Sequence, residues 1–544
     1  MDAATRFDTE IVGALPIISN YLERLQLADL VDELVPWEGE VPLGTIVEVL
    51  VSTRLLNPKA LFRIDDWTQQ TGLNRYYGLE PGQLNDDRLG RALERLAAHA
   101  EQIQAGLVLR AVKKFKLDVS QIHDDITSVE LYGAYDRDIP EGQSPPPPRP
   151  TYGHTKSGRK NVKQVQLGLN VTGDGGVPVG HVALDGNTAE ATTHLDNLRR
   201  LRDVLPKKWE LYIADTKLDT PENLLAIGAA RGKFVCGGAL TTALQQLFLR
   251  HRKQLRPVAY CPKSQEHLPP EQRDQYQGFE LPDRLVGIHA GRPTKLDYRQ
   301  VFVWSQAQER QEASTRERHV AKIQKAFEAV ERNLNKYSLK TPEAVRRRLE
   351  AARAKYAEGK LFDYELTGRS GTMRLQWQID AKALAEWKLL EGVFVLKTNL
   401  KKKQCPMPQV LRKYKEQIQV ERRMHHLKGP LAVTPMFLEK PERIAGLLCI
   451  LVWALLVLAL LERQVRRNLK GKPLYGLYPE NRPSPAPTGP SLLECFSMLC
   501  IVIIKHRGKV SRRLADPSDI QRRLLLLLGI PPGDLKTFKR RCGM

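Results

Sequence analysis

The fold is decided by the stretch LDVSQIHDDITSVELYG, residues 117–133, where a helical sequence pattern gives way to a strand-like one. Two more strand-like runs follow, VKQVQLGLNVT at 162–172 and GVPVGHVALDG at 176–186, and the glycine-rich link between them indicates a β-hairpin. The next strand, WELYIADTKL at 209–218, lies between two amphipathic helices, and KFVCGG at 233–238 is one more strand. This order predicts a mixed α/β sheet whose first strands are antiparallel.

The segments outside this pattern predict further regions. Apolar residues recur at three- and four-residue spacing before residue 113, which is typical of helices, and long charged helical tracts interrupt the α/β pattern after residue 240. A strand, a basic helix and a long apolar helix resume it after residue 390. The expected division is a helical N-terminal domain at 1–112, a first part of the core at 113–239, an inserted subdomain at 240–390, a second part of the core at 391–470 and a basic helical region at 471–544.

Composition points to a polyanionic partner. The chain has 84 Lys and Arg against 62 Asp and Glu among 544 residues, a formal net charge of +22, and nucleic acid is the first candidate for such a surplus. A basic surface that serves only solubility is the alternative. The seven cysteines are scattered without a C-x2-C pair, which argues against a disulfide framework or a zinc ribbon and fits a reducing cytosol.

One apolar stretch bears on the cellular location. Residues 444–461, IAGLLCILVWALLVLALL, contain no charge over 18 residues, which is long enough for a membrane span. No second comparable span follows, and a helix at the centre of a large protein is also apolar on all sides. We therefore expect a buried core helix, a cytoplasmic protein and no membrane partner, with a membrane anchor as the alternative.

Three acidic residues stand out by context. Asp125 within HDDITS and Asp215 within YIADT each end a predicted strand, and Glu421 lies on the basic helix YKEQIQVERRMHHLK. Brought together, two aspartates and a glutamate would make an all-oxygen site for hard divalent cations. Taken singly, a strand-end aspartate is more often a turn former or a helix cap, and Asp124 leaves the first position ambiguous by one residue.

The basic helix adds a pattern of its own. Tyr414, Glu421 and Lys428 follow one another at intervals of seven residues, so on one continuous helix they share a face. A carboxylate, a phenol and an ammonium beside Arg422 and Arg423 suit a site for metal and phosphate. A solvated basic helix with an Arg–Glu pair is the plainer interpretation of this stretch alone.

Together these motifs resemble the DDE transposases of bacterial insertion sequences, in the group whose catalytic helix carries Tyr-x2-Arg-x3-Glu-x6-Lys. Tyr414, Glu421 and Lys428 match that spacing, and Gln417 stands where the family usually has Arg. HDDITS resembles the first-aspartate motif Asp-x-Thr-Ser, which selects Asp125, and YIADTKLDTPENL resembles the second-aspartate motif. The resemblance extends over roughly residues 40–500 and implies an RNase H-like core with an insertion between the second Asp and the Glu.

The resemblance also implies the chemistry. Asp125, Asp215 and Glu421 would be both the catalytic residues and the ligands of two magnesium ions, with manganese as an alternative, that promote in-line phosphoryl transfer. The protein would cut the ends of a transposon and join the freed 3′-hydroxyl to target DNA. The expected partners are double-stranded DNA, as terminal inverted repeats and target, and a second copy of the chain. The expected DNA contacts are Tyr414, Gln417, Arg422 and Lys428, together with the N-terminal helices.

Two other functions remain open at this point. The same fold could act as a metal-dependent DNA nuclease without strand transfer, or the chain could be a catalytically silent DNA-binding protein.

Overall fold

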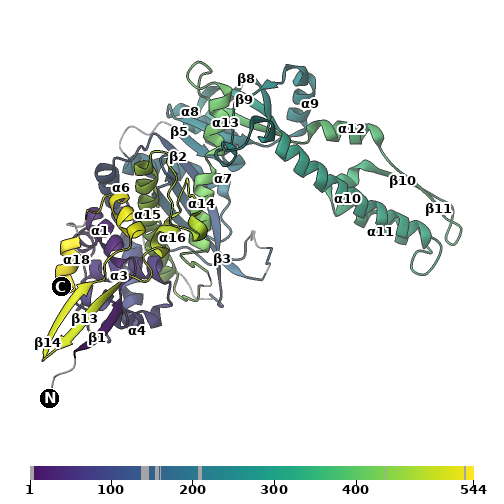
Figure 1. Ribbon diagram of the computed structural model, residues 1–544. Coiled ribbons are helices and arrows are strands. Elements are labelled where there is room, and N and C mark those ends of the chain that lie inside the picture. The colour runs from purple at the N-terminus through teal and green to yellow at the C-terminus, as the bar shows by residue number, and fades with distance from the viewer. Residues whose placement is uncertain are drawn as a thin grey trace. The chain divides into compact units, whose positions relative to one another are not determined.

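A computed structural model describes residues 5–135, 146–153, 158–159, 161–205, 211–434, 436–531 and 535–544 (Figure 1). The chain divides into two compact units. The first unit comprises residues 1–217 and 416–544, and the second comprises residues 218–415.

The sheet of the first unit contains the strand predicted within residues 117–133. Its strands run in the order β4-β3-β2-β5. The bounds are β2 Gln121–Leu131, β3 Lys163–Thr172, β4 Pro178–Asp185 and β5 Leu211–Ala214. Strand β3 is antiparallel to both β2 and β4, whereas β5 is parallel to β2. The expected mixed α/β core with antiparallel first strands is confirmed.

Helices enclose this sheet and form the N-terminal part of the unit. Their bounds are α1 Leu15–Leu25, α2 Leu27–Leu34, α3 Leu43–Leu56, α4 Ile64–Gln69, α5 Leu73–Tyr77, α6 Asp86–Phe115, α7 Glu190–Val204, α14 Ile418–Lys428 and α15 Pro441–Leu469. Helix α15 is the one helix among the described residues that is long and apolar enough to cross a membrane, and nearly all of its apolar stretch is buried in the protein. It packs against α6, α3 and β4, and so occupies the place of a core helix.

Glycine allows α15 to approach α6 closely. A Cβ atom at Gly446 would lie 2.2 Å from the main-chain oxygen of Leu93, a distance that side chains never adopt. Further along, the Trp453 indole is fully buried and donates a hydrogen bond of 2.9 Å to Gln104 Oε1 on α6. A buried indole needs such a partner, because an unpaired N–H in the core is costly.

The two ends of the chain meet in a small sheet that the sequence analysis did not predict. Strand β1, Arg6–Ile11, pairs with β13, Cys500–His506, and β13 pairs with β14, Lys509–Leu514, all antiparallel. Both terminal regions contain the expected helices, and this small sheet is an addition to them. The run CIVII favours a strand through its β-branched residues, but its pairing with β1 joins opposite ends of the sequence, which periodicity does not reveal. The C-terminal helices are α16 Gly489–Glu494, α17 Asp519–Leu527 and α18 Lys536–Arg541.

The second unit has a sheet and a helical arm. Its sheet strands run in the order β6-β12-β9-β8-β7. Their bounds are β6 Lys233–Gly238, β7 Arg256–Pro257, β8 Tyr276–His289, β9 Arg292–Ser305 and β12 Val393–Thr398. The remaining elements are α8 Pro221–Ala229, α9 Thr242–His251, α10 Gln306–Arg332, α11 Pro342–Ala354, α12 Ala381–Leu390, α13 Met407–Lys415 and the separate hairpin β10 Phe362–Thr367 and β11 Arg374–Ile379.

The arm has its own core, since Phe327 on α10 and Leu349 on α11 are buried with Phe362 of β10. Figure 1 shows α10 leading away from β8 and β9 into this arm.

One expectation about the basic helix is wrong. The sequence predicted a continuous helix through Tyr414 and Glu421, but α13 ends at Lys415 and α14 begins at Ile418. The break at residues 416–417 coincides with the boundary between the two units. Tyr414 therefore belongs to the second unit and Glu421 to the first, so a shared helix face no longer follows from their spacing.

Candidate active site

One aspartate lies on β2 and the other directly after its parallel neighbour β5. The register pairs His123 of β2 with Ile213 of β5. Asp125 lies two residues beyond His123, and Asp215 lies two residues beyond Ile213, directly after the end of β5. Since side chains alternate between the faces of a strand, Asp125 lies on the face of β2 that carries His123. Asp215 follows β5 by one residue. Both side chains are partly exposed.

Each of these aspartates also makes a local hydrogen bond. Asp125 Oδ1 accepts from the Ile126 amide at 2.9 Å, and Asp215 Oδ1 accepts from the Lys217 amide at 2.8 Å. The second bond is the turn-forming interaction typical of an aspartate at a strand end. Each carboxylate has a second oxygen, so these bonds do not exhaust its capacity as a ligand.

Asp124 points to the opposite face and is buried in a polar network. Its Oδ1 accepts a hydrogen bond of 2.9 Å from Asn197 Nδ2 on α7. Asn197 also exchanges hydrogen bonds with Asn170 of β3, at 2.8 and 2.9 Å. His194 Nδ1, one turn before Asn197, lies 3.4 Å from Asp124 Oδ2. The Asp124 carboxylate is therefore held by partners inside the protein, and it is 4% exposed.

Tyr212 of β5 completes this network. Its hydroxyl lies 3.0 Å from Asn197 Nδ2 and 3.1 Å from His194 Nδ1. Burial raises the pKa of the Tyr212 phenol well above its usual value, and the nearby charge of Asp124 raises it further. The phenol therefore stays protonated and can act as a hydrogen-bond donor. The network joins β2, β5 and α7 immediately behind the positions of Asp125 and Asp215.

Gln417 attaches the start of α14 to β2. Its Nε2 donates a hydrogen bond of 2.6 Å to the main-chain oxygen of Asp124, and its Oε1 lies 3.1 Å from His123 Nδ1. The side chain is 8% exposed. Because both ends of the amide are engaged within the protein, Gln417 acts here as a link between α14 and β2. The DNA contact expected for it stays a prediction.

Arg423 anchors the same helix further along. It is buried, donates hydrogen bonds of 2.7 and 2.8 Å to the main-chain oxygens of Gly175 and Gly176, and pairs with Glu462 of α15. Desolvation lowers the pKa of the guanidinium, while the Glu462 charge works in the opposite direction. Gly175 and Gly176 have φ values of +87° and +63°, so the turn between β3 and β4 needs residues without a side chain. Arg423 therefore joins the hairpin, α14 and α15.

Glu421 lies on α14 between these two anchors. It comes one turn after Gln417, and its side chain is exposed, as are those of Arg422 and Lys428. Tyr414 is partly buried and lies in the second unit.

Asp125, Asp215 and Glu421 all belong to the first unit, on β2, just after β5 and on α14. Within the part of the chain that the structure describes, no group of three His, Cys, Asp or Glu side chains gathers closely enough to hold a metal ion. Convergence of the three acids on shared ions remains a prediction. Their donor atoms are all carboxylate oxygens, which are the ligands that magnesium and manganese prefer.

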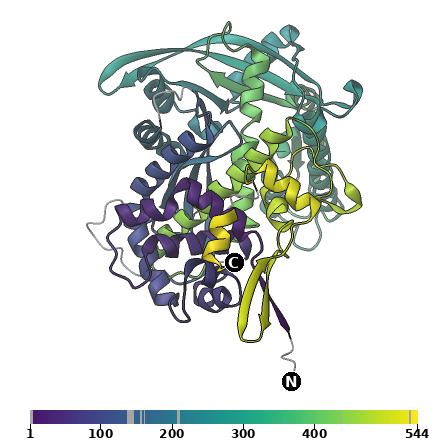
Figure 2. The ribbon, with the colours of Figure 1, turned by 60° about the vertical axis from the view of Figure 1, so that its left-hand side comes forward.

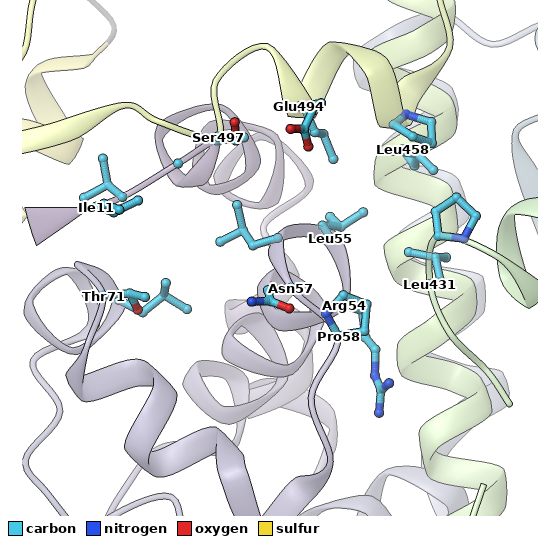
Figure 3. A pocket seen from close by; sticks show the side chains of 18 of the residues that line it. Ile11, Arg54, Leu55, Asn57, Pro58, Thr71, Leu431, Leu458, Glu494 and Ser497 are labelled. Atoms are coloured by element: carbon cyan, nitrogen blue, oxygen red, sulfur yellow. The ribbon is translucent and has the colours of Figure 1, made fainter. Parts of the chain in front are cut away.

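The first unit contains two cavities. One, of about 390 Å³, is lined by Arg54, Asn57, Thr71, Leu431 and Glu494 among others, and Figure 3 draws its side chains. The second, of about 780 Å³, is lined by residues of α6, β4 and α7 and includes Asn197. None of the three acids lines either cavity.

The sequence analysis missed the supporting residues of the site. His194 and Asn197 lie three residues apart in ATTHLDNL, on the buried side of α7, and Tyr212 precedes the YIADT aspartate by three residues. Polar residues at helical spacing among buried positions were a usable signal. They could be assigned a partner only after the face of Asp124 was known.

Comparison with known families gives two matches. The family model described as a transposase DDE domain matches residues 127–457, more than half of the 544 residues. That range includes Asp215 and Glu421 and begins two residues after Asp125. A second model, a domain of unknown function named DUF4277, matches residues 7–108. No curated protein matches the chain.

Proposed function

Because the chain belongs to the transposase DDE family, we propose that this transposase cuts the ends of a mobile DNA element and joins each freed 3′-hydroxyl to target DNA. Water attacks the phosphodiester at the element's end, and the released 3′-hydroxyl then attacks a phosphodiester of the target. Each reaction exchanges one phosphodiester oxygen for another. A single set of carboxylates therefore serves both steps.

The observation that carries this proposal is the placement of Asp125 on β2 and of Asp215 directly after the parallel strand β5, each two residues beyond the paired His123 and Ile213. We assign these two residues and Glu421 as ligands of two magnesium ions, with manganese as an alternative. When bound, such ions neutralise charge on the phosphate and activate the attacking oxygen. The burial of Asp124 supports Asp125 as the ligand from HDDITS, because the Asp124 carboxylate already serves Asn197.

Three side chains then approach the DNA in this proposal. Arg422 and Lys428 are exposed cations on α14, suited to phosphate oxygens near the scissile bond, and Tyr414 supplies a phenol from α13. Gln417, the fourth expected DNA contact, also positions Glu421 by tying α14 to β2. We also propose that residues 1–112 contribute to DNA binding, that residues 240–390 are inserted in the core, and that two copies assemble on paired ends in the cytoplasm.

The test uses duplex DNA that carries the terminal repeats flanking the reading frame, with purified protein and Mg²⁺. We expect 3′-hydroxyl nicks at the ends and joined products on sequencing gels. Glu421→Gln and Asp125→Asn should retain end binding but lose about 100-fold or more in cleavage, as expected when a group that supports transition-state charge is removed. Asp196→Asn, which alters an exposed acid on α7, is the matched control and should cut normally.

Three outcomes would contradict the proposal in different ways. Nicks without joining would identify a nuclease, and binding without nicks would identify a silent DNA-binding protein. Normal cleavage by Glu421→Gln would remove that residue from the site.

A further inference from the structure

The hairpin of β13 and β14, residues 500–514, forms a strongly basic ribbon. It contains five cations, Lys505, Arg507, Lys509, Arg512 and Arg513, and no Asp or Glu. In Figure 2 the ribbon extends away from the helices of its own unit, with β1 beside it. Residues 505–511 are all exposed. The charge is therefore presented to solvent at the end of an extended element.

Most of these cations lack an acidic partner. Lys505 pairs with Asp8 of β1 at 2.9 Å. The side chains of Arg507, Lys509 and Arg513 are exposed and make no hydrogen bond or ion pair within the described part of the chain. The nearest acid on the sheet, Asp8, already holds Lys505 and lies 3.3 Å from Arg6. Three uncompensated cations thus mark the turn and the outer strand.

The turn presents the first of them. Arg507 and Gly508 have φ values of +49° and +75°, the pattern of a tight two-residue hairpin turn that continues the twist of the strands. His506 pairs with Lys509 across the last rung of the ladder, so Arg507 lies beyond the ladder at the tip. Its guanidinium is therefore free to reach a partner ahead of the ribbon.

The outer strand presents the other two. Lys509 and Arg513 are four residues apart on β14 and so point to the same face. At about 3.4 Å per residue they lie roughly 14 Å apart. The major groove of B-form DNA is about 12 Å wide and admits a two-stranded β-ribbon. Lys509 and Arg513 can therefore each reach a different phosphate of a duplex that receives the ribbon.

From this arrangement we propose that the ribbon of residues 500–514 is a duplex-DNA contact, with Arg507, Lys509 and Arg513 neutralising phosphates. The inference rests on the proposed function, which supplies duplex DNA as the partner. It adds a DNA-binding element contributed by the end of the chain, outside the helices expected to bind DNA and outside the carboxylate site.

A second explanation for the charge is protection of a sheet edge. Strand β14 is the outer strand of its sheet, and cations on an edge discourage pairing with other chains. That role accounts for Lys509 and Arg513 but not for Arg507, which lies in the turn beyond the ladder. The two explanations differ in what the charges do to DNA affinity, which salt dependence measures directly.

The experiment measures affinity for terminal-repeat duplex by fluorescence anisotropy across a salt series. The full-length triple variant Arg507→Gln, Lys509→Gln, Arg513→Gln is compared with the wild type. Each phosphate contact contributes about 0.9 to the slope of log K against log salt, so three lost contacts should flatten it by about 2 to 3. The charge-conserving variant Arg507→Lys, Arg513→Lys should keep the wild-type slope, because phosphate neutralisation needs only the charge.

Equal slopes for the triple variant and the wild type would overturn the proposal. The proposal would also be overturned if the triple variant lost binding only to anionic vesicles or only to single-stranded RNA. If the triple variant aggregates in light scattering, Arg507→Gln alone decides the question, because it lies outside the ladder and should still flatten the slope by about 0.9.

The outcome is separable from that of the proposed function. A flattened slope in a protein that never cuts DNA would support the ribbon and refute the catalytic proposal. An unchanged slope in a protein that cuts and joins ends would refute the ribbon alone.

Discussion

Gln417 Nε2 donates a hydrogen bond of 2.6 Å to the main-chain oxygen of Asp124, the residue immediately before Asp125. This bond joins the residue that precedes α14 to the strand that carries the first proposed catalytic aspartate. Glu421 follows one turn later on the same helix. The placement of α14 beside β2 therefore depends on a neutral amide.

Loss of the Gln417 amide should reduce the cleavage rate by more than the fall in the free energy of unfolding explains. Gln417→Ala removes the donor to Asp124 and the partner of His123, at a cost of about 1–3 kcal/mol in the free energy of unfolding. We expect end binding to persist and cleavage to fall at least tenfold under conditions where the variant is fully folded.

The matched control is Gln419→Ala, which removes a comparable hydrogen bond of 2.7 Å to the Gly173 oxygen and leaves Asp124 untouched. Urea unfolding and single-turnover cleavage compare the two variants. An equal loss of cleavage in both would assign Gln417 a purely structural role.

The buried pair of Arg423 and Glu462 should be strongly coupled. Glu462 is fully buried and also pairs with Arg466, so its removal leaves two guanidinium groups without their carboxylate. Glu462→Leu and Arg423→Met should each lower the free energy of unfolding by about 3–5 kcal/mol, and the double variant by clearly less than the sum. Urea unfolding measures all three, with Arg199→Met in an exposed pair as a near-neutral control. Additive losses would contradict the coupling.

Sequence reasoning succeeded where short-range patterns dominate. The glycines before Val177 predicted the hairpin of β3 and β4, and the polar interruptions of 117–133 did not conceal the strand β2. The strand KFVCGG and the helices of the arm were also found, because their periodicity is local. The order of these elements then predicted the mixed sheet.

It failed where a feature depends on distant parts of the chain. In the antiparallel pairing of β1 with β13, Asp8 lies opposite Ile503. No sequence pattern near either residue predicts this pairing. The break before Ile418 lies in a stretch of good helix formers, so propensity alone predicted one helix. The face of Asp124 became evident only from its contact with Asn197, and the supporting network followed from that contact.

Helix α15 should not carry the protein into membranes. Its apolar surface is covered by the protein itself, and Trp453 at its middle is fully buried. After carbonate washing of a cell lysate, we expect the protein in the supernatant. Trp453→Ala should cost about 3–5 kcal/mol in stability through the lost ring, whereas the exposed Met498→Ala should be nearly neutral. Recovery of the wild type in the washed membrane pellet would contradict this prediction.

Glu48 should make the free energy of unfolding fall as the pH rises. It is 5% exposed on α3, and burial raises the pKa of its carboxyl from 4.5 to about 7. Between these values the folded chain holds a proton that the unfolded chain has lost, so raising the pH through this window favours unfolding. Each pH unit within the window lowers the free energy of unfolding by at most about 1.4 kcal/mol.

Glu48→Gln keeps the shape of the side chain without the charge, so its stability advantage over the wild type should grow from pH 5 to pH 8. Urea unfolding at four pH values measures this difference, and Glu33→Gln at an exposed site provides the control. Parallel pH profiles for Glu48→Gln and the wild type would show that Glu48 ionises as an ordinary carboxyl.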